Sequence, residues 1–175
     1  MVNISKYDLE MKYLDGTQFE AKLVDGQGKA LSGVKITFNI NGVFYDRTTD
    51  ANGIAKIKIT DVPGKYTMIT KFNGKTYKNT VTVKQVLTTK KVTIKKTYKK
   101  FTLKAKLKIN GKLVKGKVIK FKFKGKTYKA KTNKKGIAKV TIKKKVIKKL
   151  KKGKKYSVKV TYLKDTIKTT VKVKK

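Results

Sequence analysis

One eight-residue pattern occurs twice in this chain of 175 residues. Residues 49–56 read Thr-Asp-Ala-Asn-Gly-Ile-Ala-Lys, and residues 132–139 read Thr-Asn-Lys-Lys-Gly-Ile-Ala-Lys. Six positions of the first copy have identical counterparts 83 residues later: Gly28, Gly33, Gly42, Tyr45, Gly53 and Ile59. After an insertion between Ile142 and Tyr156 the offset becomes 90. Shared composition alone would not keep two copies in phase, so the chain is one module duplicated in tandem.

The duplication predicts two domains, residues 1–85 and 86–175, each of the size of a small single domain. The chain contains no cysteine, which excludes a disulfide framework and a thiolate metal site. Each domain must therefore be stabilised by side-chain packing and strand pairing.

Apolar and polar residues alternate through most of the chain, as in Phe19-Glu20-Ala21-Lys22-Leu23 and along residues 101–109. A period of two is typical of strands with one buried face. Asn-Gly, Asp-Gly and Lys-Gly pairs separate these segments, as turns between antiparallel strands require. The pattern predicts an all-β fold of two tandem immunoglobulin-like β-sandwiches with about seven strands each. The one helical turn that we expect, residues 146–152, lies in the insertion.

The aromatic side chains of the second copy fall on the apolar phase of these strands, so we expect them in the core and not on a stacking surface: Phe101, Phe121, Phe123, Tyr128, Tyr156 and Tyr162. Tyr66 and Tyr156 each begin a strand shortly after a glycine. This placement predicts a tyrosine corner, in which the phenol holds a crossing loop by one hydrogen bond.

Three ordered motifs carry a resemblance to a known family. They are residues 25–34, Asp-Gly-Gln-Gly-Lys-Ala-Leu-Ser-Gly-Val, then residues 49–55, then residues 63–67, Pro-Gly-Lys-Tyr-Thr, followed by a valine-rich strand. The chain resembles the bacterial group 1 immunoglobulin-like repeats of the invasin and intimin type, which also occur in adhesin-like surface proteins of methanogenic archaea. The resemblance implies a structural or adhesive module of the cell surface, and it brings no catalytic residue with it.

The two copies differ most in charge. Residues 1–85 contain 13 Lys or Arg against 8 Asp or Glu, whereas residues 86–175 contain 36 against 1. Nearly all of the net charge of +40 therefore belongs to the second copy. Such a field attracts polyanions and also strains the compact state by self-repulsion.

We expect the polyanion-binding surface to consist of lysines on the outward phase of the strands, together with lysines at their turns: Lys104, Lys106, Lys108, Lys120, Lys122, Lys124, Lys129, Lys131, Lys139 and Lys143. The alternative is that these lysines are an ordinary solvent face. An adenine- and thymine-rich genome would explain lysine in place of arginine, since Arg47 is the one arginine of the sequence. It explains less well why the first copy keeps its acids.

The expected partner is an anionic cell-wall or surface polymer. Base-specific recognition of nucleic acid relies on Arg, Asn and Gln, and single-strand binding adds exposed aromatic rings. Neither pattern is present, whereas lysine suits diffuse contact with a repeating anionic polymer. The leading hypothesis is a spacer domain, residues 1–85, followed by a wall-binding domain, residues 86–175. The alternative from another class is a basic protein that binds nucleic acid nonspecifically.

Catalysis is not expected. The sequence has no histidine, and the second copy has one carboxylate, Asp165, which excludes a carboxylate pair within it. No cofactor is expected. Two further alternatives stay open in the first copy: calcium bound by turn aspartates, among Asp15, Asp25, Asp46, Asp50 and Asp61, and a Lys-Asn cross-link of Lys22 with Asn79, assisted by Glu10 or Glu20.

No apolar run approaches the roughly 20 residues of a membrane span, and residues 1–10 lack the features of a secretory signal. We expect a piece of a longer exported protein that is located at the cell surface, in association with the wall. Its neighbours would be further repeats of the same kind. We expect this pair of domains to be monomeric.

Overall fold

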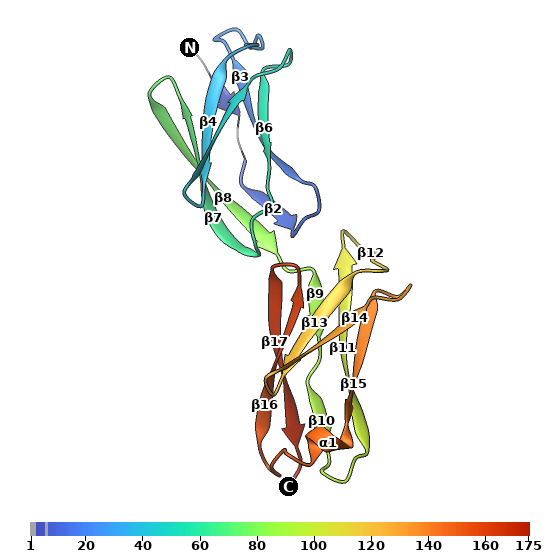
Figure 1. Ribbon diagram of the computed structural model, residues 1–175. Coiled ribbons are helices and arrows are strands. Elements are labelled where there is room, and N and C mark those ends of the chain that lie inside the picture. Colours follow the sequence, from blue (N-terminus) through green and yellow to red (C-terminus); the bar gives the residue numbers. More distant parts are fainter. Residues whose placement is uncertain (1–2, 6) are drawn as a thin grey trace. The chain divides into compact units, whose positions relative to one another are not determined.

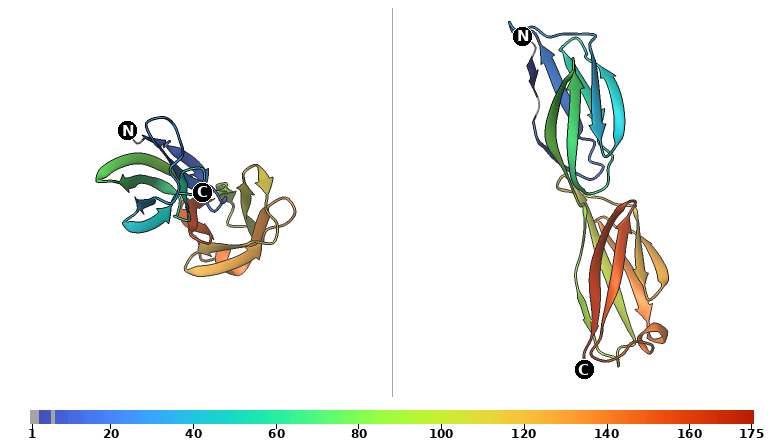
Figure 2. Two further views of the ribbon diagram at one scale, coloured as in Figure 1. Left: turned by 90° about the horizontal axis from the view of Figure 1, so that it is seen from above. Right: turned by 90° about the vertical axis from the view of Figure 1, so that its left-hand side faces the viewer.

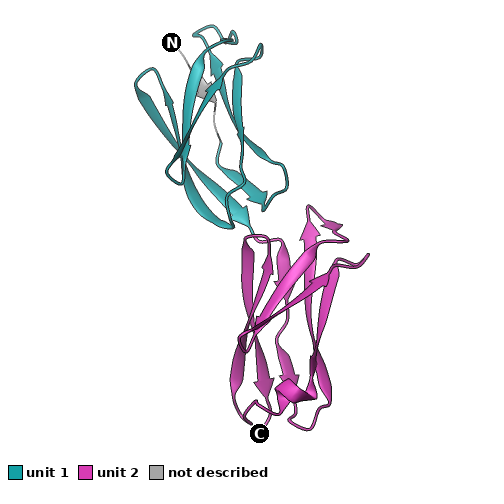
Figure 3. Cartoon of the chain, in the orientation of Figure 1, with its two compact units in different colours: residues 1–84 teal, residues 85–175 magenta. Residues whose placement is uncertain are grey.

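The computed structural model describes residues 3–5 and 7–175. The chain forms two compact units, Met1–Lys84 and Gln85–Lys175, which are coloured separately in Figure 3. Each unit is a sandwich of two β-sheets, so the predicted all-β fold with two immunoglobulin-like β-sandwiches is confirmed (Figures 1 and 2).

In unit 1, a three-stranded sheet of order β1-β3-β6 packs against a five-stranded sheet of order β2-β8-β7-β4-β5. The strands are β1 (Asn3–Ser5), β2 (Leu9–Lys12), β3 (Gln18–Val24), β4 (Lys35–Ile40), β5 (Val43–Thr48), β6 (Ile54–Lys58), β7 (Gly64–Phe72) and β8 (Lys75–Lys84). The pairing is antiparallel except between β2 and β8, which run parallel.

Unit 2 repeats this arrangement, with sheets of order β12-β11-β15, where β9 also pairs with β11, and β10-β17-β16-β13-β14. Its elements are β9 (Leu87–Thr89), β10 (Val92–Ile94), β11 (Lys100–Ile109), β12 (Lys112–Leu113), β13 (Val118–Phe123), β14 (Lys126–Lys131), β15 (Ile137–Lys143), α1 (Lys144–Ile147), β16 (Lys155–Tyr162) and β17 (Asp165–Val173). The first strand of each unit is divided in two because the chain changes sheets, which is one reason the strands exceed the predicted seven.

The core of each unit lies between its two sheets and follows the sequence alternation. In β13, for example, Ile119, Phe121 and Phe123 are buried while the residues between them are exposed. The rings of Phe19 and Phe38 meet edge to face at 5.9 Å in unit 1, and those of Phe101 and Phe123 do so at 6.0 Å in unit 2. Such pairs add about 1 kcal/mol each to what burial alone contributes.

The expectation that six aromatic residues point inward is confirmed for the four that are buried, Phe101, Phe121, Phe123 and Tyr162. Tyr128 and Tyr156 are half-buried. The tyrosine corner is also confirmed in both units: the Tyr66 hydroxyl donates to the carbonyl of Val62, and the Tyr156 hydroxyl accepts from the backbone N–H of Lys151 at 2.7 Å.

The duplicated octapeptide forms the same turn twice. In unit 1, Asp50 Oδ1 accepts backbone N–H groups of Asn52 and Ile54 at 2.8 and 3.0 Å. In unit 2, Asn133 Oδ1 accepts the equivalent N–H groups, two and four residues on, at 2.9 and 3.1 Å. The acid of the first copy is thus replaced by an amide that makes the same two hydrogen bonds.

A glycine within this turn explains why the pattern is retained. Gly136 has a φ of +71°, and a Cβ at this position would lie 2.5 Å from the carbonyl oxygen of Leu107. Gly53 has a φ of +75° and the same relation to Leu23, at 2.4 Å. Both the backbone conformation and the lack of space therefore require glycine.

Two details differ from the sequence-based expectations. The helical turn begins earlier, because α1 spans Lys144–Ile147 and only non-helical turns follow it up to Leu150. The offset of 83, which the sequence shows from Gly28 onward, does not extend back into β3 and β11. Leu23 and Leu107 donate to the equivalent carbonyls of Gly53 and Gly136, so β3 and β11 are related by an offset of 84.

Candidate functional site: the lysine faces of unit 2

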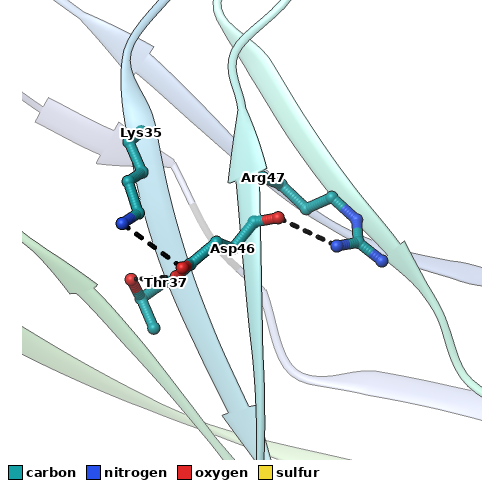
Figure 4. Close-up of polar contacts among 4 residues, drawn as sticks. All are labelled: Lys35, Thr37, Asp46 and Arg47. Carbon is teal, nitrogen blue, oxygen red and sulfur yellow. Dashed lines mark hydrogen bonds and ion pairs between the residues drawn. The ribbon is translucent and has the colours of Figure 1, made fainter.

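In unit 1, the outer face of the five-stranded sheet carries a balanced cluster around an acid (Figure 4). Asp46 on β5 stands directly opposite Thr37 on β4, whose hydroxyl donates to Oδ1 at 2.7 Å. Lys35 Nζ lies 3.3 Å from Oδ2, and Arg47 Nη1 donates to the Asp46 carbonyl at 2.8 Å. The Thr37 hydroxyl, together with Lys35, holds the pKa of Asp46 below its ordinary value, so the carboxylate is charged.

The same two positions in unit 2 are both lysines. Lys120 on β13 and Lys129 on β14 lie 83 residues after Thr37 and Asp46, and they stand directly opposite each other. Like charges that face each other across two strands are destabilising. A position that carries an acid in unit 1 thus carries a cation beside another cation in unit 2.

The opposite sheets, three-stranded in unit 1 and four-stranded in unit 2, show the same exchange on the other side of each sandwich. In unit 1, Glu20 on β3 stands opposite Lys56 on β6, a pair of opposite charges. Their counterparts in unit 2 are Lys104 on β11 and Lys139 on β15, a pair of like charges. Both outer faces of unit 2 have therefore lost an acid at a cross-strand pair.

Three lysines form a row across the five-stranded sheet of unit 2. Lys122 on β13 stands opposite Lys159 on β16, which stands opposite Lys168 on β17. Adjacent strands are about 4.8 Å apart, so the row presents cations at short, regular intervals. Beside it, Thr161 and Thr166 face each other with their hydroxyl oxygens 3.1 Å apart.

Lys159 and Lys168 were not among the lysines predicted from the sequence. The signal for Lys159 was present, because it alternates with the buried Val158 and Val160. What the sequence lacks is the register that places it beside Lys122 and Lys168. The pairing of Lys159 with Lys122 depends on hydrogen bonds between β13 and β16, which are far apart in the chain.

All ten predicted lysines are exposed, but the structure does not bring them together on one surface. On the five-stranded sheet lie Lys120, Lys122, Lys129 and Lys131, with Lys124 in the turn between β13 and β14. On the four-stranded sheet of β9, β11, β12 and β15 lie Lys104, Lys106, Lys108, Lys139 and Lys143. The candidate site therefore consists of two lysine faces, one on each side of unit 2. Their role in binding remains a prediction.

The one carboxyl of unit 2 does not neutralise these faces. Asp165 is fully buried at the start of β17, where Oδ2 accepts the backbone N–H groups of Val86 and Leu87 at 2.8 and 3.3 Å. Burial raises the pKa of this carboxyl. Among the described residues, none of the ten predicted lysines forms an ion pair, whereas unit 1 has Lys35–Asp46 and Lys84–Glu10.

Lysines also cover two half-buried aromatic rings of unit 2. Lys124 Nζ lies 4.9 Å from the ring centre of Tyr156, and Lys126 Nζ lies 5.1 Å from that of Tyr128. These cation–π contacts occupy ring faces on which a nucleic-acid base would otherwise stack.

Three of the five aspartates considered for calcium, Asp15, Asp25 and Asp50, accept hydrogen bonds from backbone N–H groups. Asp25 Oδ1 accepts the N–H groups of Gln27 and Lys29, and Asp15 accepts those of Lys12 and Thr17. Within residues 3–5 and 7–175, no group of three or more acidic side chains is placed to hold a metal ion.

The components of the suggested cross-link have other positions and partners. Lys22 is exposed on the three-stranded sheet, whereas Asn79 lies on β8 of the five-stranded sheet and donates to Asp8. Glu10 pairs with Lys84 at 2.9 Å. The cross-link hypothesis is therefore not supported, because the structure does not bring its members together.

No helix in the described part of the chain has the length and apolar character needed to cross a membrane.

No family model and no curated protein matches the sequence. Among solved structures, the chain is similar to a 1.5-MDa bacterial ice-binding adhesin (15% identity, TM-score 0.34, covering 99% of this chain and 64% of that one). It is similar to invasin, a bacterial integrin-binding protein, with 16% identity and a TM-score of 0.43, covering 99% of this chain and 39% of that one. It is also similar to the D0-D1 domain of intimin, with 20% identity and a TM-score of 0.39, covering 100% of this chain and 98% of that one. The chain thus spans less than two thirds of the adhesin and invasin structures. At these TM-scores the matches carry no information about what this chain binds.

Proposed function

We propose that unit 2 binds an anionic polymer of a cell wall or cell surface through its lysine faces, and that unit 1 serves as a spacer. The observation that carries this proposal is the exchange of acid for lysine at equivalent cross-strand pairs on both faces. Lys104 and Lys139 replace Glu20 and Lys56, and Lys120 and Lys129 replace Thr37 and Asp46.

The fold does not require this exchange, because unit 1 forms the same sandwich with acids in place. Each like-charged pair costs a few tenths of a kcal/mol up to about 1 kcal/mol relative to a neutral pair. A genome rich in lysine codons explains lysine in place of arginine, but it does not explain the loss of acids from one copy alone. Binding of an anionic partner would relieve the repulsion, which gives the exchange a functional reason.

The chemistry of the faces favours a repeating polymer over a specific nucleic-acid site. The row Lys122–Lys159–Lys168 presents flexible point charges at strand spacing. Arg47, the one arginine of the chain, lies in unit 1 and donates to the Asp46 carbonyl. Arginine forks are thus absent from unit 2, and lysines lie over the rings of Tyr128 and Tyr156.

The motifs of unit 1 resemble invasin- and intimin-type repeats, which supports a non-catalytic role as a tandem module of an adhesin-like surface protein. In this proposal the chain is located at the cell surface with further repeats as neighbours, and the pair of units is monomeric. The archaeal origin suggested by the resemblance belongs to the proposal as well.

The proposal is tested by co-sedimentation of the full chain with beads that carry poly(glycerol phosphate), over a range of salt concentrations. We expect binding at low salt and a steep loss of binding as salt increases, since each neutralised anion releases a counterion. A variant with Lys122→Thr, Lys159→Thr and Lys168→Thr should bind more weakly and show a shallower salt dependence.

The matched control removes three exposed lysines from the segment after α1, by Lys149→Thr, Lys151→Thr and Lys152→Thr. It has the same net charge as the row variant, so equal losses in both variants would contradict binding by the sheet face. Absence of binding at low salt would overturn the proposal altogether. Duplex DNA is added as a competitor: if it displaces the protein at far lower phosphate concentration than free polymer does, the nucleic-acid alternative is favoured.

A further inference from the structure

A groove lies on the four-stranded sheet of unit 2, where the first strand changes sheets. β9 pairs with β11 as far as Thr89, opposite Ala105, and the chain then crosses to β17 at Val92. The part of β11 before Ala105 therefore has no strand beside it on this edge. A concavity of about 610 Å³ opens there, within the size range of small-molecule sites.

The lining of this groove combines three kinds of surface. The half-buried side chains of Val92 and Ile137 provide an apolar floor. Lys104 and Lys106 provide cations, and Thr102 provides a hydroxyl. Thr88 and Thr89 add two more hydroxyls at the rim, and the hydroxyl of Thr89 already donates to the Lys104 carbonyl at 2.6 Å. No carboxylate lines the groove.

We propose that this groove binds one anionic sugar residue of the polymer, a sugar ring that carries a carboxylate or phosphate. A sugar ring has apolar C–H faces and hydroxyls at its edge, so the floor contacts the ring while the threonine hydroxyls bond to its edge. Lys104 and Lys106 contact the anionic group, as charge complementarity requires. This inference rests on the proposed function and narrows it from any polyanion to an anionic saccharide.

The corresponding positions of unit 1 would not favour such a ligand. With the offset of 84 that relates β3 to β11, Glu20 stands where Lys104 stands, and Gln18 stands where Thr102 stands. A carboxylate at the position of Lys104 would repel an anionic sugar. Unit 1 therefore serves as an internal comparison within the same chain.

The test is a titration of the full chain with trigalacturonate, followed by amide NMR shifts. We expect saturable shifts at Thr88, Thr102, Lys104 and Ile137, and none at Glu20. Maltotriose, which is neutral, and hexaglutamate, which is anionic but not a sugar, should not produce them. Equal binding of hexaglutamate would overturn the proposal, because it would show that the groove attracts any anion and does not recognise the sugar ring.

Two variants separate the groove from general charge, because neither changes the net charge. Thr102→Trp fills the groove, and Thr127→Trp places the same side chain on β14 of the other sheet as a control. We expect at least tenfold weaker trigalacturonate binding for the first variant alone. Thr88→Val, which keeps the shape of the side chain, tests the same point should Thr102→Trp fail to fold. Loss of one hydrogen bond should weaken binding about three- to tenfold, and unchanged affinity would contradict the proposal.

The row variant of Lys122, Lys159 and Lys168 distinguishes failure of this inference from failure of the proposed function. It should retain trigalacturonate binding while losing part of its binding to the poly(glycerol phosphate) beads. If the wild-type chain binds the beads but not trigalacturonate, the sugar site is wrong and the wall-binding proposal stands. If it binds neither, both are wrong.

Discussion

Restoring acids to the lysine faces should stabilise unit 2 and weaken its binding to the polymer. The informative changes are Lys104→Glu, which recreates the pair of Glu20 and Lys56, and Lys129→Glu, which places an acid where unit 1 has Asp46. Each new carboxylate would stand opposite a lysine. Lys104→Gln and Lys129→Gln serve as neutral steps between the two charges.

The magnitude follows from the pairing geometry. Side chains on directly opposite residues start about 5 Å apart, and at about 7 Å between charged groups the Coulomb energy in water is about 0.6 kcal/mol. A change from lysine to glutamine removes this repulsion, and glutamate adds a similar attraction, so charge reversal should stabilise by about 1 kcal/mol at low salt. Physiological salt reduces the gain to less than half, because the Debye length is about 8 Å.

Thermal unfolding at low salt, physiological salt and 1 M salt measures this effect. A gain of about 1 kcal/mol raises the Tm of a domain of this size by roughly 4 to 8 °C. The order of stability should be glutamate, then glutamine, then lysine, and the differences should vanish at 1 M salt. The reasoning is refuted if glutamine and glutamate are equally stable, or if the differences persist at 1 M salt.

Three further predictions concern the scaffold. Lowering the pH below about 4 should destabilise unit 1 selectively, because five of its carboxyls have depressed pKa values and their contribution is lost as they protonate. The pH dependence from Asp165 has the opposite sign. Because the pKa of Asp165 is raised in the folded state, its contribution to the stability of unit 2 is greatest below its unfolded pKa of 3.8 and is lost as the pH rises. Urea unfolding at pH 3 and pH 7, followed through the NMR amide signals of each unit, checks both predictions. Gly136→Ala should destabilise unit 2 by at least twice as much as Gly111→Ala, because both residues have a positive φ but only a Cβ at Gly136 would meet a carbonyl oxygen. Gly111→Ala should cost about 1 kcal/mol of unfolding free energy. Equal costs of the two changes in chemical denaturation would contradict the steric argument. Tyr156→Phe removes one hydroxyl acceptor and should cost about 1 kcal/mol in the same assay, whereas an unchanged unfolding midpoint would mean that the corner contributes nothing.

Much of the fold follows from local sequence. The alternation of period two indicates which side of a strand is buried, and it correctly places Phe121 inside and Lys120 outside. The retained octapeptide predicts equivalent turns, because the geometry depends on a side-chain oxygen at Asp50 or Asn133 and on glycine three residues later. These are short-range requirements that a sequence states directly.

The pairing of residues across strands does not follow in the same way. A constant offset of 83 matches Lys104 with the buried Ala21, whereas strand pairing matches it with Glu20. The loop between the two matched segments is one residue shorter in unit 2, and in a strand one residue exchanges the two faces. The row through Lys159 was missed for a related reason, since its register is set by partners elsewhere in the chain.

Asp165 shows a different limit of sequence reasoning. The sequence identifies it as the one acid of a basic domain, but it does not show that Asp165 is buried and accepts hydrogen bonds from the backbone of Val86 and Leu87. Nothing local to residue 165 identifies those partners, which lie nearly 80 residues earlier in the chain.

The turn shared by Asp50 and Asn133 has a practical consequence. Its two hydrogen bonds need an oxygen acceptor and are made equally by a carboxylate and by an amide. The backbone geometry of this turn therefore does not require a charged acceptor. A protein engineer could titrate the charge of such a module residue by residue while its loops stay superimposable. The resulting set of variants, which would share one fold and differ in net charge, would measure how charge alone controls adsorption to a surface.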